Sequence, residues 1–286
     1  MTTPIEYSDP VKALAQYEES ISSYDADTWI DFVAEFELTA EHIPELIQLA
    51  QDLDGAWAAR ENDYDVWEIP VLNAIQALGQ LGAVEAIPPL LDVLNRNEIE
   101  GWDSDELFEY IPSAIGLMGP DALAPIANFI DDTLNSVYAR AGLADAFEYI
   151  VARHPEQRDA AVELATTLLS HHAKLDRWIN STLVGQLVKL EAVESADVIE
   201  AVFEAGDIDL SIHGDWEEVQ ILLGLLEERI TPVPEGGWHG ASEKELLRMF
   251  AGTGRPTKQV RSKKQFKKVA AAKKKAKKKK KKKRKR

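Results

Sequence analysis

Three segments of the chain resemble one another, and each carries a proline at the same place. They read LTAEHIPELIQLA from Leu38, LGAVEAIPPLLDVL from Leu81 and MGPDALAPIANFI from Met118, with Pro44, Pro88 and Pro125 in register. A helix tolerates proline in its first turn, where the backbone N–H groups have no partner within the helix. We therefore expect each of these prolines to lie in the opening turn of a helix.

The rest of the pattern predicts a chain that is nearly all α. Apolar residues recur three and four positions apart from residue 9 to residue 230, with little strand-like alternation. Helices preceding the second and third proline segments are expected at 67–81 and 105–118, each followed by a glycine, Gly82 or Gly119. Two weaker copies pair 136–153 with 155–170 and 176–190 with 195–205. The spacings of the three prolines, 44 and 37 residues, are close to those of helix-pair repeats.

Several motifs resemble those of a known family. ALGQLGAVEAIPPLL, residues 77–91, resembles the HEAT-like repeat named after phycobilisome lyases. LTAEHIPELI, ARHPEQRD (152–159) and DLSIHGDWEEVQ (209–220) are similar to segments of uncharacterised bacterial HEAT-repeat proteins. The resemblance implies a HEAT/armadillo-type α-solenoid of about five helix pairs. Some proteins of such groups carry a Cys-rich metal-binding module, whereas this chain has no cysteine.

The predicted organisation has four parts. Residues 1–37 form N-terminal capping helices and residues 38–206 form the repeat array. Residues 207–251 form a C-terminal cap, in which the start is too polar for a helix and 216–229 makes one amphipathic helix. Residues 252–286 are a linker and a disordered lysine-rich tail, because so many like charges prevent folding alone.

Charge divides the chain sharply. Residues 258–286 hold 19 Lys or Arg and no Asp or Glu, whereas residues 1–257 hold 13 basic and 49 acidic residues and carry a net charge of −36. Such a tail favours nonspecific binding to a polyanion such as RNA, a ribosome or DNA. The tail residues expected to contact it are Lys263, Lys264, Lys267, Lys268, Lys273, Lys274, Lys275, Lys277, Lys278, Lys279, Lys280, Lys281, Lys282, Lys283, Arg284, Lys285 and Arg286. Alternatives are an anionic membrane, nuclear import, a solubility role or folding back on the acidic body.

Tryptophans and acids occur together in the expected connections between helix pairs. Aromatic anchors among carboxylates are typical of a surface that recognises a basic partner. The residues expected to bind a protein partner are Trp57, Trp67, Trp102, Asp103, Asp105, Glu106 and Trp216. The alternative for each tryptophan is a place in the core, with the acids solvated.

Templates for catalysis are missing from the sequence. No nucleotide-binding, hydrolase, zinc-protease or calcium-loop spacing occurs, and no cysteine is available as nucleophile or ligand. His171 and His172 with Asp176 could approach a metal, but they are expected at a helix end, and His213 with Asp215 is expected in a glycine turn. We expect a cytoplasmic, non-catalytic scaffold without a cofactor or membrane span. The alternative that the resemblance implies is a phycobilin lyase or bilin chaperone.

Overall fold

The structure, a computed structural model, describes residues 7–17, 24–59, 68–102 and 104–232, all within the first of the chain's two units, Met1–Gly240. Every regular element in these residues is a helix, and no strand occurs among them, which confirms the all-α prediction for this part. The α-helices are α1 (Asp9–Ala15), α2 (Phe32–Glu35), α3 (Ile43–Gln51), α4 (Leu53–Ala59), α5 (Ile69–Gln80), α6 (Ile87–Ile99), α7 (Asp105–Met118), α8 (Leu123–Asp131), α9 (Val137–Leu143), α10 (Asp145–Arg153), α11 (Arg158–Leu169), α12 (Arg177–Lys189), α13 (Ala196–Ala205), α14 (Leu210–His213) and α15 (Trp216–Leu222). The predicted tail and the end of the predicted cap lie outside the described residues.

One local arrangement recurs five times along the chain. A single turn of 3₁₀-helix runs directly into an α-helix. These turns are η2 (Ala40–His42) before α3, η3 (Val84–Ala86) before α6, η4 (Pro120–Ala122) before α8, η5 (Pro155–Gln157) before α11 and η7 (Val193–Ser195) before α13. The prediction for Pro44, Pro88 and Pro125 is confirmed, because each lies in the first turn of its α-helix. The remaining 3₁₀ turns are η1 (Ala26–Thr28) and η6 (His172–Lys174).

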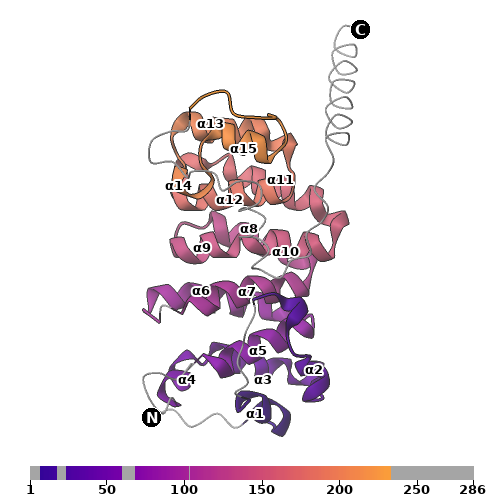
Figure 1. Cartoon of the computed structure of the whole chain (residues 1–286). Coiled ribbons are helices and arrows are strands. Elements are labelled where there is room, and N and C mark those ends of the chain that lie inside the picture. The colour runs from indigo at the N-terminus through magenta and orange to yellow at the C-terminus, as the bar shows by residue number, and fades with distance from the viewer. Residues whose placement is uncertain (1–6, 18–23, 60–67, 103, 233–286) are drawn as a thin grey trace. The chain divides into compact units, whose positions relative to one another are not determined.

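The helices of this unit form two layers in which each helix contacts the next (Figure 1). One layer contains α3, α6, α8, α11 and α13. The other contains α5, α7, α10, α12 and α14, with α9 placed between α7 and α12. α1 and α2 contact α5 at the N-terminal end, and α15 contacts α13 at the C-terminal end.

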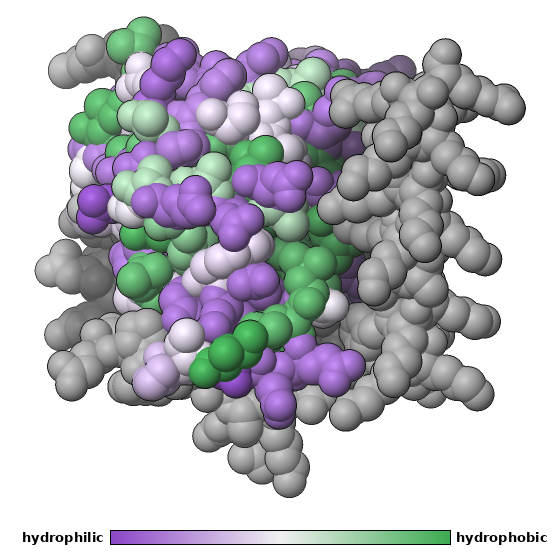
Figure 2. All heavy atoms as spheres, turned by 90° about the horizontal axis from the view of Figure 1, so that it is seen from above, coloured by the Kyte–Doolittle hydropathy of each residue, from purple (hydrophilic) through white to green (hydrophobic). Residues whose placement is uncertain are grey.

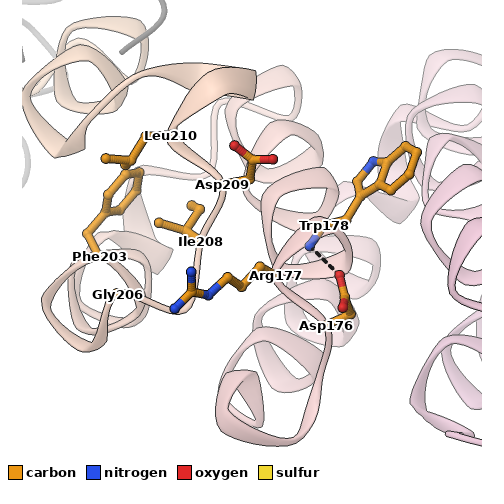
Figure 3. Close-up of a pocket in the computed structure, with 8 residues that line it drawn as sticks. All are labelled: Asp176, Arg177, Trp178, Phe203, Gly206, Ile208, Asp209 and Leu210. Carbon is orange, nitrogen blue, oxygen red and sulfur yellow. Dashed lines mark hydrogen bonds between the residues drawn. The ribbon is translucent and has the colours of Figure 1, made fainter. Parts of the chain in front are cut away.

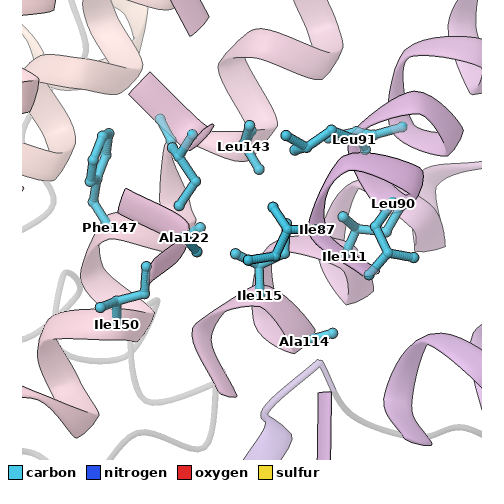
Figure 4. Packing of buried hydrophobic residues seen from close by; sticks show 14 of the residues in the cluster. Ile87, Leu90, Leu91, Ile111, Ala114, Ile115, Ala122, Leu143, Phe147 and Ile150 are labelled. Atoms are coloured by element: carbon cyan, nitrogen blue, oxygen red, sulfur yellow. The ribbon is translucent and has the colours of Figure 1, made fainter. Parts of the chain in front are cut away.

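The core lies between these layers (Figure 4). Ile87 and Leu90 of α6 face Ile111 of α7, and Leu143 of α9 and Phe147 of α10 continue the same cluster. Each of these five side chains is at most 1% exposed. Since burying such a side chain contributes about 1.5 to 3 kcal/mol relative to leaving it in water, the amphipathic faces hold successive helices together.

The helices agree with the sequence pattern at α1 and differ from it at α7 and at 136–153. Helix α1 begins after Ser8 with Pro10 in its first turn, as expected of a proline at a helix start. α7 also contains Pro112 in its interior, where proline removes the donor for the Phe108 carbonyl, so the helices of this chain carry proline outside their opening turns as well. The expected helix 136–153 is divided at Ala144 into α9 and α10.

The predicted C-terminal cap differs from the structure in two ways. The segment expected to be too polar for a helix contains α14, a single turn whose N-terminal amides are capped by Asp209. The helix expected at 216–229 ends at Leu222, because Gly224 adopts a positive φ of 70° and turns the chain. Sequence periodicity did not detect this turn.

Close approach of α7 and α10 predicts that Gly116→Ala destabilises the chain. A Cβ at residue 116 would lie 2.5 Å from the Tyr149 Cβ, so the two helices would have to separate. We expect a loss of about 1 to 3 kcal/mol, measured by thermal unfolding.

Gly142→Ala provides the matched control. A Cβ there would meet Phe108 at 3.5 Å, an ordinary contact, and alanine favours the helix. Equal unfolding midpoints for the two variants would contradict the packing described for α7 and α10.

Candidate functional site

The connections between successive helix pairs lie along one side of this unit (Figure 1), which we call the connecting edge: residues 52–59, 97–102, 104–106, 131–138, 171–178 and 206–210. Neighbouring segments are joined by direct contacts. The ring of Trp57 contacts that of Trp102, and Tyr138 N donates to Glu98 Oε2 at 3.2 Å. Further along, His171 Nδ1 lies 3.5 Å from Asp131 Oδ1. His172 Nδ1 lies 2.6 Å from Asp207 Oδ2, which joins the last two segments. The connecting edge therefore forms one continuous surface.

Two of the predicted partner-binding residues meet on this edge. Trp57 of α4 and Trp102, in the connection after α6, form an edge-to-face pair with ring centroids 5.8 Å apart. Trp102 Nε1 donates to Glu100 Oε2 at 3.2 Å, and Glu100 is paired with Arg96. Trp57 is 40% exposed, so this pair presents indole surface next to a carboxylate.

The connection that carries Trp102 is held by a buried amide. Asn97 Nδ2 donates to the Ser104 carbonyl at 2.9 Å, and Ser104 N donates to Asn97 Oδ1 at 3.0 Å. Beside this connection, burial raises the pKa of Glu68. The predicted residues Asp105 and Glu106 lie in the first turn of α7, where carboxylates favour the helix N-terminus. Trp67 and Asp103 lie outside the described residues.

A second aromatic pair on the edge was not predicted from the sequence. Tyr138 and Trp178 lie edge to face with centroids 4.5 Å apart, and they are 48% and 38% exposed. Tyr138 is the second residue of α9 and Trp178 is the second residue of α12, so each lies two positions after its N-cap, Ser136 or Asp176. An aromatic residue two positions after an N-cap residue such as Ser or Asp is the sequence signal that could have identified them.

Helix α15, which begins with Trp216, lies at the opposite end of the unit from α4, which contains Trp57 (Figure 1). Trp216 packs against Phe203 with centroids 5.8 Å apart, and donates to Glu200 Oε1 at 3.2 Å. The three tryptophan-bearing connections therefore do not form one compact cluster. Trp57 and Trp102 lie on the connecting edge, whereas Trp216 belongs to α15, beyond the last segment of that edge.

Exposed apolar side chains are concentrated on this edge. Of the eleven large hydrophobic residues that are exposed in the described part of the chain, six belong to it: Trp57, Ile99, Leu134, Tyr138, Trp178 and Leu210. Its described segments from 97 to 210 contain nine carboxylates against Lys174 and Arg177 as the lysine and arginine residues. Figure 2 shows, at the α13–α15 end, hydrophobic patches separated by hydrophilic residues. This combination suits a partner that is both apolar and basic.

A cavity of about 560 Å³ opens on the edge between α12, α13 and α14 (Figure 3). Phe203, Ile208 and Leu210 form an apolar wall, and Asp176 and Asp209 supply carboxylates. The cavity lies between the Tyr138–Trp178 pair and the Phe203–Trp216 pair, because Trp178 and Phe203 each contribute to its lining.

The histidines have structural contacts. His171 and His172 follow the end of α11, as expected. His172 Nδ1 lies 2.6 Å from Asp207 Oδ2, whereas Asp176 caps α12 by accepting from Trp178 N. His213 precedes the expected glycine turn, in which Gly214 has a φ of 76°, and it is the last residue of α14. It also packs so closely on Gly185 that a Cβ on residue 185 would lie 2.5 Å from His213 Nε2. Burial lowers the pKa of His213, and Lys189 lowers it further.

No group of three or more candidate metal ligands occurs in the described ranges. Across the same ranges, no helix has the length and apolar character needed to cross a bilayer.

Comparisons with family models, with curated proteins and with solved structures found no match to this chain. The resemblance to HEAT-like repeats therefore stays a prediction from the sequence motifs. The candidate site is defined by its own geometry, chiefly the aromatic pairs and the cavity.

The cap that carries Trp216 depends on an ion pair. Arg229 donates to both carboxylate oxygens of Asp215, at 2.9 and 2.5 Å, and this bonding lowers the pKa of Asp215. Arg229→Gln should cost about 1 kcal/mol at pH 7, which lowers the thermal midpoint by about 2 to 4 °C.

The pH dependence follows from the sign of that shift. Because the folded chain lowers the pKa of Asp215, the stabilisation is present above the ordinary value of 3.8 and is lost as the pH falls through the lowered value. The difference between wild type and Arg229→Gln should therefore shrink below pH 4. Arg153→Gln is the control, since its partner Asp27 is 76% exposed and contributes little. A difference that is constant from pH 7 to pH 3 would contradict this assignment.

Proposed function

We propose that this chain is a non-catalytic cytoplasmic scaffold. Its body is a HEAT/armadillo-type α-solenoid of about five helix pairs, and its connecting edge binds a protein partner that carries basic residues. The lysine-rich tail attaches the assembly to a polyanion such as RNA, a ribosome or DNA.

Two observations support the solenoid and the resemblance to HEAT-like repeats. The 3₁₀-to-α arrangement recurs at residues 43, 87, 123, 158 and 196, at intervals close to those of helix-pair repeats. Within each layer the helices contact their neighbours in chain order. Repeat proteins of this kind use their extended surfaces for binding.

The observation that carries the partner-binding role is the row of aromatic pairs on the connecting edge. Trp57, Tyr138 and Trp178 are exposed, and Trp102 is half-buried between Trp57 and the core. Tryptophan and tyrosine dominate the binding energy of many interfaces, and surrounding carboxylates accelerate encounter with a cationic partner. A net charge of −36 on residues 1–257 acts in the same direction.

The tail role rests on the sequence, since all of the tail lies outside the described residues. Its 19 basic residues without an acid favour phosphate contacts that carry no base specificity. The sign of the body's charge opposes such contacts elsewhere on the chain.

Replacing aromatic residues on the edge tests partner binding. Full-length chains carrying Trp57→Ala with Trp102→Ala, or Tyr138→Ala, should retain about one tenth or less of the proteins that co-purify with wild type after nuclease treatment, because interface aromatics often contribute about 2 kcal/mol or more. Quantitative mass spectrometry measures the loss.

Val84→Ala is the control, because Val84 is 37% exposed on η3, away from the connecting edge. Thermal unfolding verifies that each variant is folded. Partners retained by the edge variants at wild-type levels would reject the connecting edge as the binding surface. A coloured adduct after co-expression with a bilin would instead favour the lyase alternative.

A salt series tests the tail. Full-length chain should bind single-stranded RNA with an affinity that falls steeply with salt, by about 10³ to 10⁵ between 50 and 200 mM if 6 to 10 phosphates are neutralised. Replacing the basic residues from Lys273 to Arg286 by glutamine should abolish most of the binding. Equal affinities of the two chains, measured by fluorescence anisotropy, would reject the tail as the polyanion site.

A further inference from the structure

The lining of this cavity is mixed: Phe203, Ile208 and Leu210 form an apolar wall, whereas Asp176, Arg177 and Asp209 are charged. Ile208 is 6% exposed, whereas Leu210 on the same wall is 40% exposed and meets the solvent. Gly206 contributes no side chain to the space and adopts a left-handed conformation with φ of 72°. A volume of about 560 Å³ is within the range of sites that hold small ligands or partner side chains.

The rim is held by hydrogen bonds from α12. The fully buried Asn180 donates through Nδ2 to the His172 carbonyl at 3.1 Å and to the Asp207 carbonyl at 2.8 Å. Asp209 N donates to Ser181 Oγ at 2.9 Å. Because the walls are formed before anything binds, little conformational entropy is lost on insertion of a side chain.

The charges around the opening favour a cation. Asp176 caps α12 and Asp209 caps α14, each through Oδ1, so both carboxylates are fixed in position. Hydrogen bonds from the Ser211 hydroxyl and backbone lower the pKa of Asp209, which keeps it ionised. Two further carboxylates lie nearby: Glu200 accepts a hydrogen bond from Trp216 Nε1, and Asp207 contacts His172 Nδ1.

Arg177 is the one cation that lines the cavity. Figure 3 shows its guanidinium on the Gly206 side of the cavity, below Ile208. It is exposed, and its charge contributes to the lowered pKa of Asp209. Its long stem can swing into solvent, whereas the carboxylates are held as helix caps. Arg177 therefore opposes a cationic partner only weakly.

We propose that this cavity is the anchor site of the partner: it takes an apolar side chain of another protein that has an arginine or lysine directly beside it. The apolar side chain lies against Phe203, Ile208 and Leu210, and the cation lies between Asp209 and Asp176. The exposed Trp178 and the half-buried Trp216 flank the bound segment. This inference rests on the proposed partner-binding function and specifies the chemistry of the partner.

Three capped five-residue peptides test the proposal against the full-length ¹⁵N-labelled chain. One has a central leucine between two arginines, one a central leucine between two glutamates, and one a central serine between two arginines. The arginine–leucine peptide should shift the indole N–H signals of Trp178 and Trp216 saturably and leave those of Trp57 and Trp102 unchanged. The other two peptides should bind at least fivefold more weakly.

Variants that keep the fold separate the contributions. Leu210→Ser should weaken binding of the arginine–leucine peptide at least threefold, whereas Leu225→Ser, with a similar exposure outside the cavity, should not change it. Asp209→Asn removes the charge but retains an N-cap residue, and it should also weaken binding. Arg177→Gln should strengthen binding, since it removes a like charge. Thermal unfolding confirms that each variant is folded.

Three results would overturn the proposal: stronger binding of the glutamate-flanked peptide, weaker binding after Arg177→Gln, or no change on Leu210→Ser. Uniform shifts of all indole signals would indicate nonspecific attraction to the acidic body and would equally reject it. If the cavity fails while Trp57 and Trp102 variants still lose the co-purified partner, the edge remains the binding surface. If both experiments fail, the proposed function fails with the inference.

Discussion

Buried asparagine side chains hold the connections between helices, and the candidate site depends on them. Asn73 donates to the carbonyls of Leu14 and Tyr17 at the end of α1, Asn97 exchanges two hydrogen bonds with Ser104, and Asn180 donates to the carbonyls of His172 and Asp207. Buried backbone carbonyl groups need a hydrogen-bond donor, and the asparagine side chains supply it at helix ends and in the connections between helices. The loops are thereby fixed relative to the helices that carry the aromatic residues.

Fixed loops explain how apolar side chains can remain on the surface. Tyr138 and Trp178 begin helices whose buried faces point into the core, so their own positions after the N-caps direct them outward. The carboxylates that surround them also serve as helix caps, as Asp176 and Asp209 do. One set of residues therefore both terminates helices and gives the edge its negative charge, which ties the fold to the proposed recognition of a basic, apolar partner.

Helical periodicity and prolines were sufficient to predict most of the helices and the five-fold recurrence, because both reflect local backbone chemistry. They failed where tertiary contacts decide. Pro112 is tolerated inside α7, Asp145 after the break at Ala144 is bound by Lys189 and Gln186 of α12, and Arg229 returns to Asp215 beyond Gly224. Likewise, the sequence predicted that Trp57 and Trp102 belong to one partner-binding surface. It did not predict the Tyr138–Trp178 pair or the cavity, because these arise from loops brought together by folding.

The central claim is that partners bind the connecting edge rather than the turns η2, η3, η4, η5 and η7, which precede α3, α6, α8, α11 and α13. Hydrogen–deuterium exchange of the full chain with and without its co-purified partner measures this directly. The account predicts slower exchange at 97–106, 131–138, 171–178 and 206–210 in the complex, with no change at 83–87, 120–123 and 155–158. Slower exchange confined to the 3₁₀ turns, with the connecting edge unchanged, would contradict it.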